Sequence, residues 1–151
     1  MRYFTSDFHF GHKNILKYRN EFSTIEEHDQ AIYDMLVKAT KHDIVTIVGD
    51  MLFKCANELN YLDILSKFPC QFELIPGNHD ALHLIPQYPS NLHVSYGLAG
   101  IKEFWVSHCP IHQNEFRDRK INIHGHLHKE VVTCMLQYMS KDNYATWETM
   151  P

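Results

Sequence analysis

Short apolar runs, each followed at once by a polar cluster, recur along this chain. The clearest run is Ile44–Val48, five consecutive β-forming residues without alternation, which predicts a strand buried on both faces. A second run, Phe72–Ile75, within a strand expected at Gln71–Ile75, leads through a proline into Gly77-Asn78-His79-Asp80. Helical patterns at Ile25–Thr40 and Asn57–Lys67 separate the runs. Strands that alternate with helices favour a mostly parallel sheet, with the polar clusters along one edge.

The pattern changes after Asp80, where shorter apolar runs are separated by glycines and prolines. Leu92–Tyr96 and Ile101–Val106 predict antiparallel hairpins in a second sheet. A length of 151 residues predicts one domain over residues 1–151. Further strands are expected at Arg2–Ser6, Ile121–His124, Val131–Met139 and Asn143–Trp147.

Composition limits the classes of function. A formal net charge of −4 argues against an extended basic surface for duplex nucleic acid, and no apolar stretch is long enough to span a membrane. The four cysteines form no Cys-x-x-Cys pair, and Met1–Phe4 leads into a strand without a signal-peptide core, so we expect free thiols and a cytoplasmic location. Twelve histidines in 151 residues point to metal binding or proton transfer.

The polar clusters contain ligand types suited to transition metals. In an extended segment, residues two apart point to the same side, so Asp7 can converge with His9, and His126 with His128. A single Asp-x-His is more often a surface carboxylate beside a histidine at the edge of the core. Asp50, after Gly49, fits a turn former equally well. Five clusters together favour a metal site: Asp7-Phe8-His9, Gly49-Asp50, Gly77–Asp80, His108 and Gly125–His128.

These five blocks, in this order and at roughly this spacing, resemble the calcineurin-like metallophosphoesterase superfamily. The segment His9–Asn14 is also similar to the small, capless bacterial and bacteriophage branch. The resemblance implies an α/β fold of two stacked mixed β-sheets flanked by helices, a four-layer αββα sandwich with the metals at one end. For this branch the expected location is the cytoplasm of a bacterium, or of the host cell if a phage encodes the chain.

The resemblance also implies a site for two divalent metal ions. One metal would be held by Asp7, His9, Asp50 and His128, and the other by Asp50, Asn78, His108 and His126. Mixed Asp, Asn and His ligands suit Mn²⁺ best, with Fe, Zn²⁺ or Ni²⁺ as alternatives. A hydroxide that bridges the metals would attack phosphorus, with His79 as general acid and Asp80 hydrogen-bonded to its imidazole. His12 is a candidate contact to substrate or metal, and His124 is interpreted as structural.

The expected substrate is a small phosphoester or nucleotide-type molecule. An open site without a cap slightly favours a phosphodiester over a phosphomonoester. Two alternatives remain: a metal-binding scaffold or partner-binding module without turnover, and a nuclease acting on short or single-stranded nucleic acid. The residues indicate no particular oligomeric state.

Overall fold

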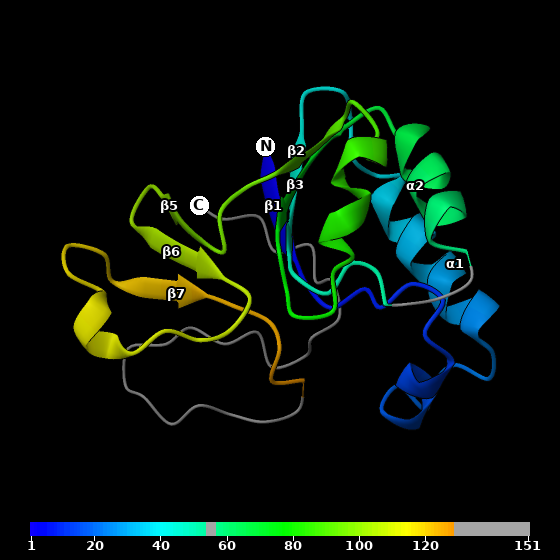
Figure 1. Cartoon of the computed structure of the whole chain (residues 1–151), viewed down its shortest axis with the longest axis horizontal. Coiled ribbons are helices and arrows are strands. Elements are labelled where there is room, and N and C mark those ends of the chain that lie inside the picture. The colour runs from blue at the N-terminus through cyan, green and yellow to red at the C-terminus, as the bar shows by residue number, and fades with distance from the viewer. Residues whose placement is uncertain (54–56, 129–151) are drawn as a thin grey trace.

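The computed structural model describes residues 1–53 and 57–128. Its first sheet has the order β1-β2-β3-β4, with every neighbouring pair parallel. Two α-helices cover one face of this sheet, as Figure 1 shows. The strands are β1 (Arg2–Thr5), β2 (Ile44–Val48), β3 (Gln71–Ile75) and β4 (Leu92–Val94), and the helices are α1 (Ile25–Leu36) and α2 (Glu58–Ser66).

A second sheet lies on the side of the first sheet away from the helices (Figure 1). It contains β5 (Leu98–Ile101), β6 (Phe104–Ser107) and β7 (Ile121–Ile123), in that order. The β5–β6 pair is antiparallel and the β6–β7 pair is parallel. A small core joins the two sheets through Val48, Ile75, Phe104 and Val106. The predicted α/β sandwich of two sheets is therefore confirmed.

The helix α1 begins with the capping box that its sequence encodes. The Thr24 side chain accepts a hydrogen bond from the Glu27 amide, and the Glu27 carboxylate accepts one from the Thr24 amide. The helix ends at Leu36, four residues before the predicted end at Thr40. The amides of residues 38 and 39 donate to carbonyls three residues back, so the chain tightens into turns instead of continuing the helix. Three 3₁₀ segments complete the described elements: η1 (Lys13–Lys17), η2 (Leu82–Gln87) and η3 (Gln113–Glu115).

Two predictions for the second half of the chain are corrected. The strand at Leu92 belongs to the first sheet, where it pairs in parallel with β3, and not to an antiparallel hairpin. Its position follows from Asn91, whose amide donates to three carbonyl oxygens between the end of α2 and the start of β3. The run Ile101–Val106 is divided between β5 and β6 by a turn at Lys102, which has φ of 52°. The expected strands Val131–Met139 and Asn143–Trp147 lie outside the described residues.

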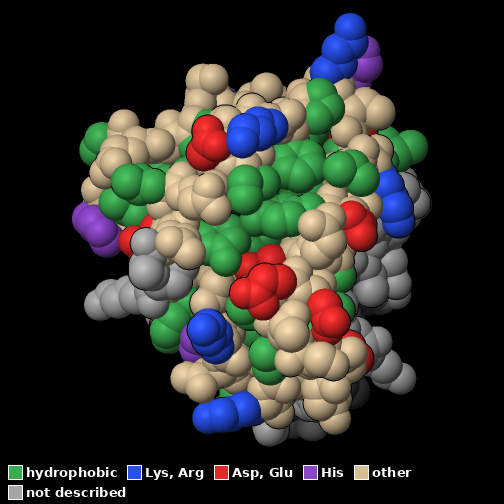
Figure 2. Space-filling model, turned by 90° about the vertical axis from the view of Figure 1, so that its right-hand side faces the viewer, with side chains coloured by type: hydrophobic (Ala, Val, Ile, Leu, Met, Phe, Trp, Pro, Cys, Tyr) green, Lys and Arg blue, Asp and Glu red, His purple; other side chains and the backbone are tan. Residues whose placement is uncertain are grey.

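The outer face of the helical layer is shown in Figure 2, where hydrophobic side chains gather near the centre and charged side chains lie around them. Val37, just after α1, and Leu59, in α2, are among the exposed large apolar residues. Within the described residues, every helix falls short of the length and apolar character that a membrane span requires.

Candidate metal centre

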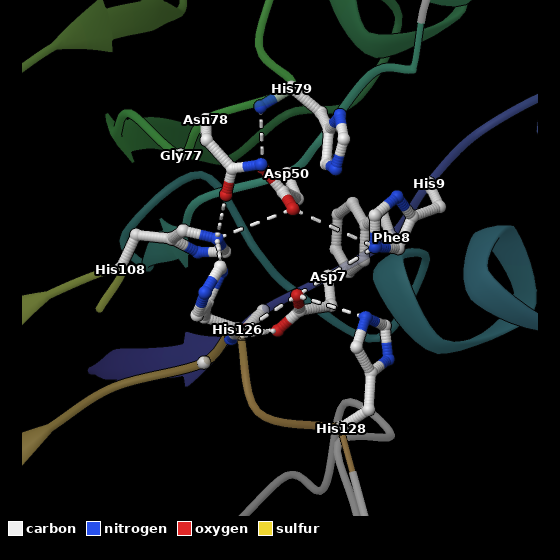
Figure 3. A network of polar contacts seen from close by, with 12 residues as sticks. Asp7, Phe8, His9, Asp50, Gly77, Asn78, His79, His108, His126 and His128 are labelled. Carbon is white, nitrogen blue, oxygen red and sulfur yellow. Dashed lines mark hydrogen bonds and ion pairs between the residues drawn. The ribbon is translucent and has the colours of Figure 1, made fainter. Parts of the chain in front are cut away.

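Loops after five strands bring the predicted ligands to one end of the sandwich. Asp7 and His9 follow β1, Asp50 follows β2, and Asn78 follows β3, all at the carboxyl edge of the first sheet. His108 follows β6 in the second sheet. His126 and His128 follow β7 and complete the cluster. Figure 3 shows these side chains pointing toward a common centre from both sheets.

The side chains form two groups that could each hold a metal ion. In the first group, one ligand atom each from Asp7, His9 and His128 lie within 4.8 Å of one another. In the second group, the same is true of Asp50, His108 and His126. The Oδ1 atom of Asn78 lies 3.2 Å from the Nε2 atom of His108, which places it at the second group. Each group therefore combines side chains from the first and the second sheet.

Asp50 lies between the two groups. Its Oδ2 atom is 3.3 Å from Nε2 of His108 and 3.8 Å from Nε2 of His9. Its Oδ1 atom accepts a hydrogen bond of 2.9 Å from the backbone amide of His79. One buried carboxylate thus borders both ligand groups, which is the position that a bridging ligand requires.

The ligand loops have a left-handed backbone, which side chains other than glycine rarely adopt. Seven described non-glycine residues have positive φ, and five of them are predicted ligands. Asp7 and His9 were expected to converge through an extended backbone, but their φ angles are 55° and 48°. Strained backbone of this kind concentrates at functional sites. The five residues are Asp7, His9, Asp50, His126 and His128.

At three places, the residue before a predicted ligand is a glycine whose missing side chain prevents a steric clash. A Cβ atom on Gly49, which has φ of 81°, would overlap the His108 ring. A Cβ on Gly77 would overlap the Asp50 carboxylate and amide, and one on Gly125 would overlap Asp7 and Ser6. The three loops can therefore approach one another only because these residues have no side chain.

The protonation of His108 favours a cation at the second group. Its Nδ1–H donates to the Val48 carbonyl at 3.0 Å, so in the neutral ring the lone pair is on Nε2. That lone pair faces Asp50 Oδ2, Asn78 Oδ1 and, at 3.1 Å, Nδ1 of His126. Electron pairs brought this close repel one another unless a proton or a metal ion lies among them. The donor atoms present therefore fit a divalent cation.

The first ligand group also has features that favour a bound cation. Both ring nitrogens of His9 are buried and have no hydrogen-bond partner in the part of the chain that the structure describes. Unsatisfied polar atoms at buried positions are costly, and metal coordination is one way to satisfy them. Asp7, which has no exposed surface, accepts hydrogen bonds from Ser6 Oγ and from the His126 amide. The first donor set therefore also fits a cation.

The two carboxylates remain ionised in spite of their burial. Burial alone raises the pKa of Asp7, but the nearby imidazole of His9, a hydrogen bond from Ser6 and the imidazoles of His108 and His128 bring its pKa below the ordinary value. For Asp50, burial is likewise outweighed by its interactions with His108, so its pKa is lowered. Burial opposes protonation of His108, yet Asp50 and the Val48 carbonyl raise its pKa. The centre thus favours positive charge between these side chains.

His79 lies beside the first ligand group with its side chain exposed. Its ring centroid is 5.8 Å from that of His9 and 4.6 Å from that of Phe53 (Figure 3 shows His79 and His9). The ring of His12 stacks on Phe53 with centroids 3.7 Å apart. The structure therefore places both His12 and His79 at the rim of the centre.

Asp80 differs from its predicted role. Instead of a hydrogen bond to the His79 imidazole, its carboxylate accepts bonds from the backbone amides of Asp50, Met51, Leu52 and Gly77. These bonds, between 2.7 and 3.2 Å, fasten the loop after β3 to the loop after β2. Asp80 thereby positions the backbone of Asp50. His124, interpreted as structural, directs Nδ1 to the neighbouring Gly125 carbonyl.

Two features of the surroundings were missed from the sequence. Phe53, which stacks with His12, is three residues after Asp50, and only that proximity in sequence could have indicated it. Arg19 is buried and donates to the carbonyl of Asp7, although its position in a polar stretch predicts a solvated side chain. No local pattern distinguishes such an arginine from its exposed neighbours.

Comparisons with known proteins agree with this geometry. A family model described as calcineurin-like phosphoesterase matches residues 3–148. The gene 66 protein of Mycobacterium phage L5 is 33% identical over 164 residues, which cover 86% of this chain and 78% of the phage protein. An uncharacterized protein of Methanocaldococcus jannaschii is 32% identical over 80 residues, covering 52% of this chain and 46% of its own.

A solved structure is also similar. The crystal structure of a protein of unknown function from Aquifex aeolicus has a TM-score of 0.68 and 26% sequence identity, and the match covers 90% of this chain and 83% of that one. The family match extends over nearly the whole sequence, and it agrees with two groups of possible metal ligands at the edge of a two-sheet sandwich. The chain belongs to the calcineurin-like phosphoesterase family, whose members are metal-dependent phosphoester hydrolases.

Proposed function

We propose that this chain hydrolyses a phosphodiester with the help of two divalent metal ions, of which Mn²⁺ is favoured. The observation that carries the proposal is the position of Asp50, one of whose oxygens lies within 3.8 Å of a histidine nitrogen in each ligand group. One ion would be held by Asp7, His9, Asp50 and His128, and the other by Asp50, Asn78, His108 and His126. Bound together, two such ions lower the pKa of water for attack on phosphorus and neutralise the phosphoryl oxygens.

His79 is the proposed proton donor to the leaving oxygen. Its backbone amide donates to Asp50, which anchors the backbone of His79 beside the proposed bridging carboxylate. Its ring is exposed, which allows a substrate to reach it. A positioned imidazole can give up a proton near neutral pH and contributes about 10²- to 10⁴-fold to a rate.

The exposure of the rim supports a diester substrate. Asn78 and His79 are both exposed, so we expect the site to admit a phosphorus atom that carries two organic substituents. His12, held against Phe53, is the proposed contact to one of these substituents. A small nucleotide-type or cyclic diester is the class of substrate that fits an acidic chain with this rim.

The proposal can be tested with metal-stripped protein. Mn²⁺, Ni²⁺ or Zn²⁺ is added in turn, and the hydrolysis of an aryl phosphate diester is compared with that of the matching monoester. We expect turnover with Mn²⁺ and a higher kcat/KM for the diester. A higher value for the monoester would reverse the proposed preference. Protein that binds two ions per chain but cleaves neither ester would support the scaffold alternative.

The proposed role of His79 has its own test. His79→Asn should lower kcat by about 10²-fold or more, because the proton donor is lost, while the number of bound Mn²⁺ ions is unchanged. His93→Asn is the matched control, since His93 is an exposed histidine on β4, away from the centre. A His79→Asn variant with the kcat of the control would exclude the proposed general acid.

A further inference from the structure

Three buried polar side chains lie behind the loop that carries Asp7 and His9, and the chemistry described above uses none of them. Arg19 follows η1, and His28 and Asp29 are in the first half of α1. Their relative exposures are 5%, 1% and 5%. Burying an arginine and a carboxylate is costly unless their hydrogen bonds are satisfied, so their positions require an explanation.

Both ends of this group hold the backbone of the metal loop. The guanidinium of Arg19 donates to the Asp7 carbonyl at 2.5 Å and to the Phe8 carbonyl at 3.5 Å. At the other end, the Asp29 Oδ2 atom accepts a hydrogen bond of 3.2 Å from the Gly11 amide. The contacts therefore reach the loop on both sides of His9.

The hydrogen bond between Arg19 and His28 determines which ring nitrogen of His28 carries the proton. A guanidinium can only donate, so the Nε2 atom of His28, 2.6 Å from Nη1 of Arg19, must accept. The proton of the ring is then on Nδ1, which donates to Asp29 Oδ1 at 2.8 Å. Tyr61 donates to the other oxygen of Asp29 at 2.7 Å. A neutral imidazole thus links a buried positive charge to a buried negative one.

The loop held by this group has an unfavourable backbone. Asp7, His9 and Gly11 all have positive φ, between 48° and 72°. The left-handed conformation costs about 1–2 kcal/mol for a residue with a side chain, so surrounding contacts must maintain it. His9 has no hydrogen bond to its ring from the described residues, so its orientation depends on its backbone and on the rings packed against it.

We propose that Arg19, His28 and Asp29 are positioning residues, which hold residues 7–11 in the left-handed conformation that directs Asp7 and His9 at one cation. The proposal rests on the metal centre proposed above. It goes beyond that centre because it assigns the affinity of the first ligand group to side chains that contact neither metal nor substrate. Outer partners that orient metal ligands typically contribute 10- to 100-fold to metal affinity.

The test is Mn²⁺ binding to the full chain, measured by calorimetric titration of the metal-stripped protein. His28→Leu removes both imidazole hydrogen bonds, whereas His28→Gln keeps one acceptor and one donor. We expect His28→Leu to weaken one of the two Mn²⁺ sites about tenfold or more, and His28→Gln to restore part of that loss. Asp29→Asn, which keeps the shape of the side chain, replaces His28→Leu if that variant does not fold.

Asn91→Ala is the matched control for loss of stability. Asn91 also donates to several backbone carbonyls, but it does so at the start of β4, at the opposite edge of the first sheet. This variant should unfold at a lower temperature and bind both Mn²⁺ ions as the wild type does. Equal Mn²⁺ affinities in the wild type, His28→Leu and Asp29→Asn would overturn the positioning role. Wild-type protein that binds no Mn²⁺ would overturn the metal centre as well.

Discussion

The glycines at the metal centre are selected by what lies against them. Gly49, Gly77 and Gly125 each occupy a place where a Cβ atom would overlap a predicted ligand from another loop. Gly97, in the link between β4 and β5, has no atom within 4 Å of the corresponding position. The same residue type is thus essential at one place and replaceable at another.

Gly49→Ala tests this difference. The new methyl group would collide with the His108 ring, and alanine at φ of 81° adds about 1–2 kcal/mol of backbone strain. We expect a loss of unfolding free energy of at least that size in urea denaturation, together with weaker Mn²⁺ binding in titration. Gly97→Ala is the control and should change neither quantity. A Gly49→Ala variant as stable as Gly97→Ala would contradict the steric explanation.

The spacing of the motifs predicted which side chains would come together. It did not predict the backbone conformation that brings them together. Asp7 and His9 do lie together, but through two left-handed residues and not through the alternation of a strand. From the resemblance, Asp80 was expected to form a hydrogen bond with the His79 imidazole. Instead, its carboxylate accepts hydrogen bonds from four backbone amides. These bonds exist only when the loops after β2 and β3 lie together in the fold, so the sequence alone does not indicate them.

At the scale of elements, strands inside the first sheet were the most predictable. Residues Ile44–Val48 and Gln71–Ile75 form strands with the predicted bounds, because central parallel strands are apolar over their whole length. The three-residue strand β4 was assigned to the wrong sheet. Its few residues do not indicate which strand β4 pairs with. That pairing depends on the contacts of Asn91 with residues that are distant in the sequence.

The turn between α1 and β2 is expected to make stability depend on pH. Asp43 accepts hydrogen bonds from the Met1 ammonium group and from the Thr40 amide and hydroxyl, and these lower the pKa of its carboxyl below the ordinary 3.8. Because the folded protein favours the ionised form, the stabilisation is fully present above pH 4 and is lost as the pH falls below the ordinary pKa.

Asp43→Asn isolates this contribution. The variant should unfold at a lower temperature than the wild type at pH 7, and the difference should shrink as the pH falls below about 4. Thermal unfolding followed by circular dichroism from pH 7 to pH 2 measures it. Asp63→Asn is the control, because Asp63 is an exposed carboxylate in α2 that forms an ion pair with Lys67, one helical turn away. A difference that stays constant across this range would exclude Asp43 as its source.

At the scale of the whole molecule, each ligand group joins the two sheets. Asp7 and His9 from the first sheet meet His128 from the second, and Asp50 from the first meets His108 and His126. In the part of the chain that the structure describes, the core between the sheets contains four buried apolar side chains with partly buried ones packed against them, and metal coordination would add to this attachment. This attachment could not be predicted from separate motifs, because it depends on how the sheets stack.

Metal removal should therefore destabilise the fold. A ligand that binds only the folded state stabilises it, by about 2.7 kcal/mol per site when its free concentration is 100 times Kd. We expect the midpoint of thermal unfolding to fall when EDTA replaces excess Mn²⁺. In Asp50→Asn, which lacks the proposed shared carboxylate, EDTA should lower the midpoint less. Identical midpoints for the wild type with and without Mn²⁺ would show that the sheets stay together without ions.

Because the ligands of each ion come from both sheets, neither half of the polypeptide contains all the ligands of either ion. A break in the exposed link at Tyr96, between β4 and β5, would leave Asp7, His9, Asp50 and Asn78 on one fragment and His108, His126 and His128 on the other. Each ion would then be bound only when the two fragments reassociate. The fold therefore contains the elements of a split reporter whose reassembly responds to transition metals.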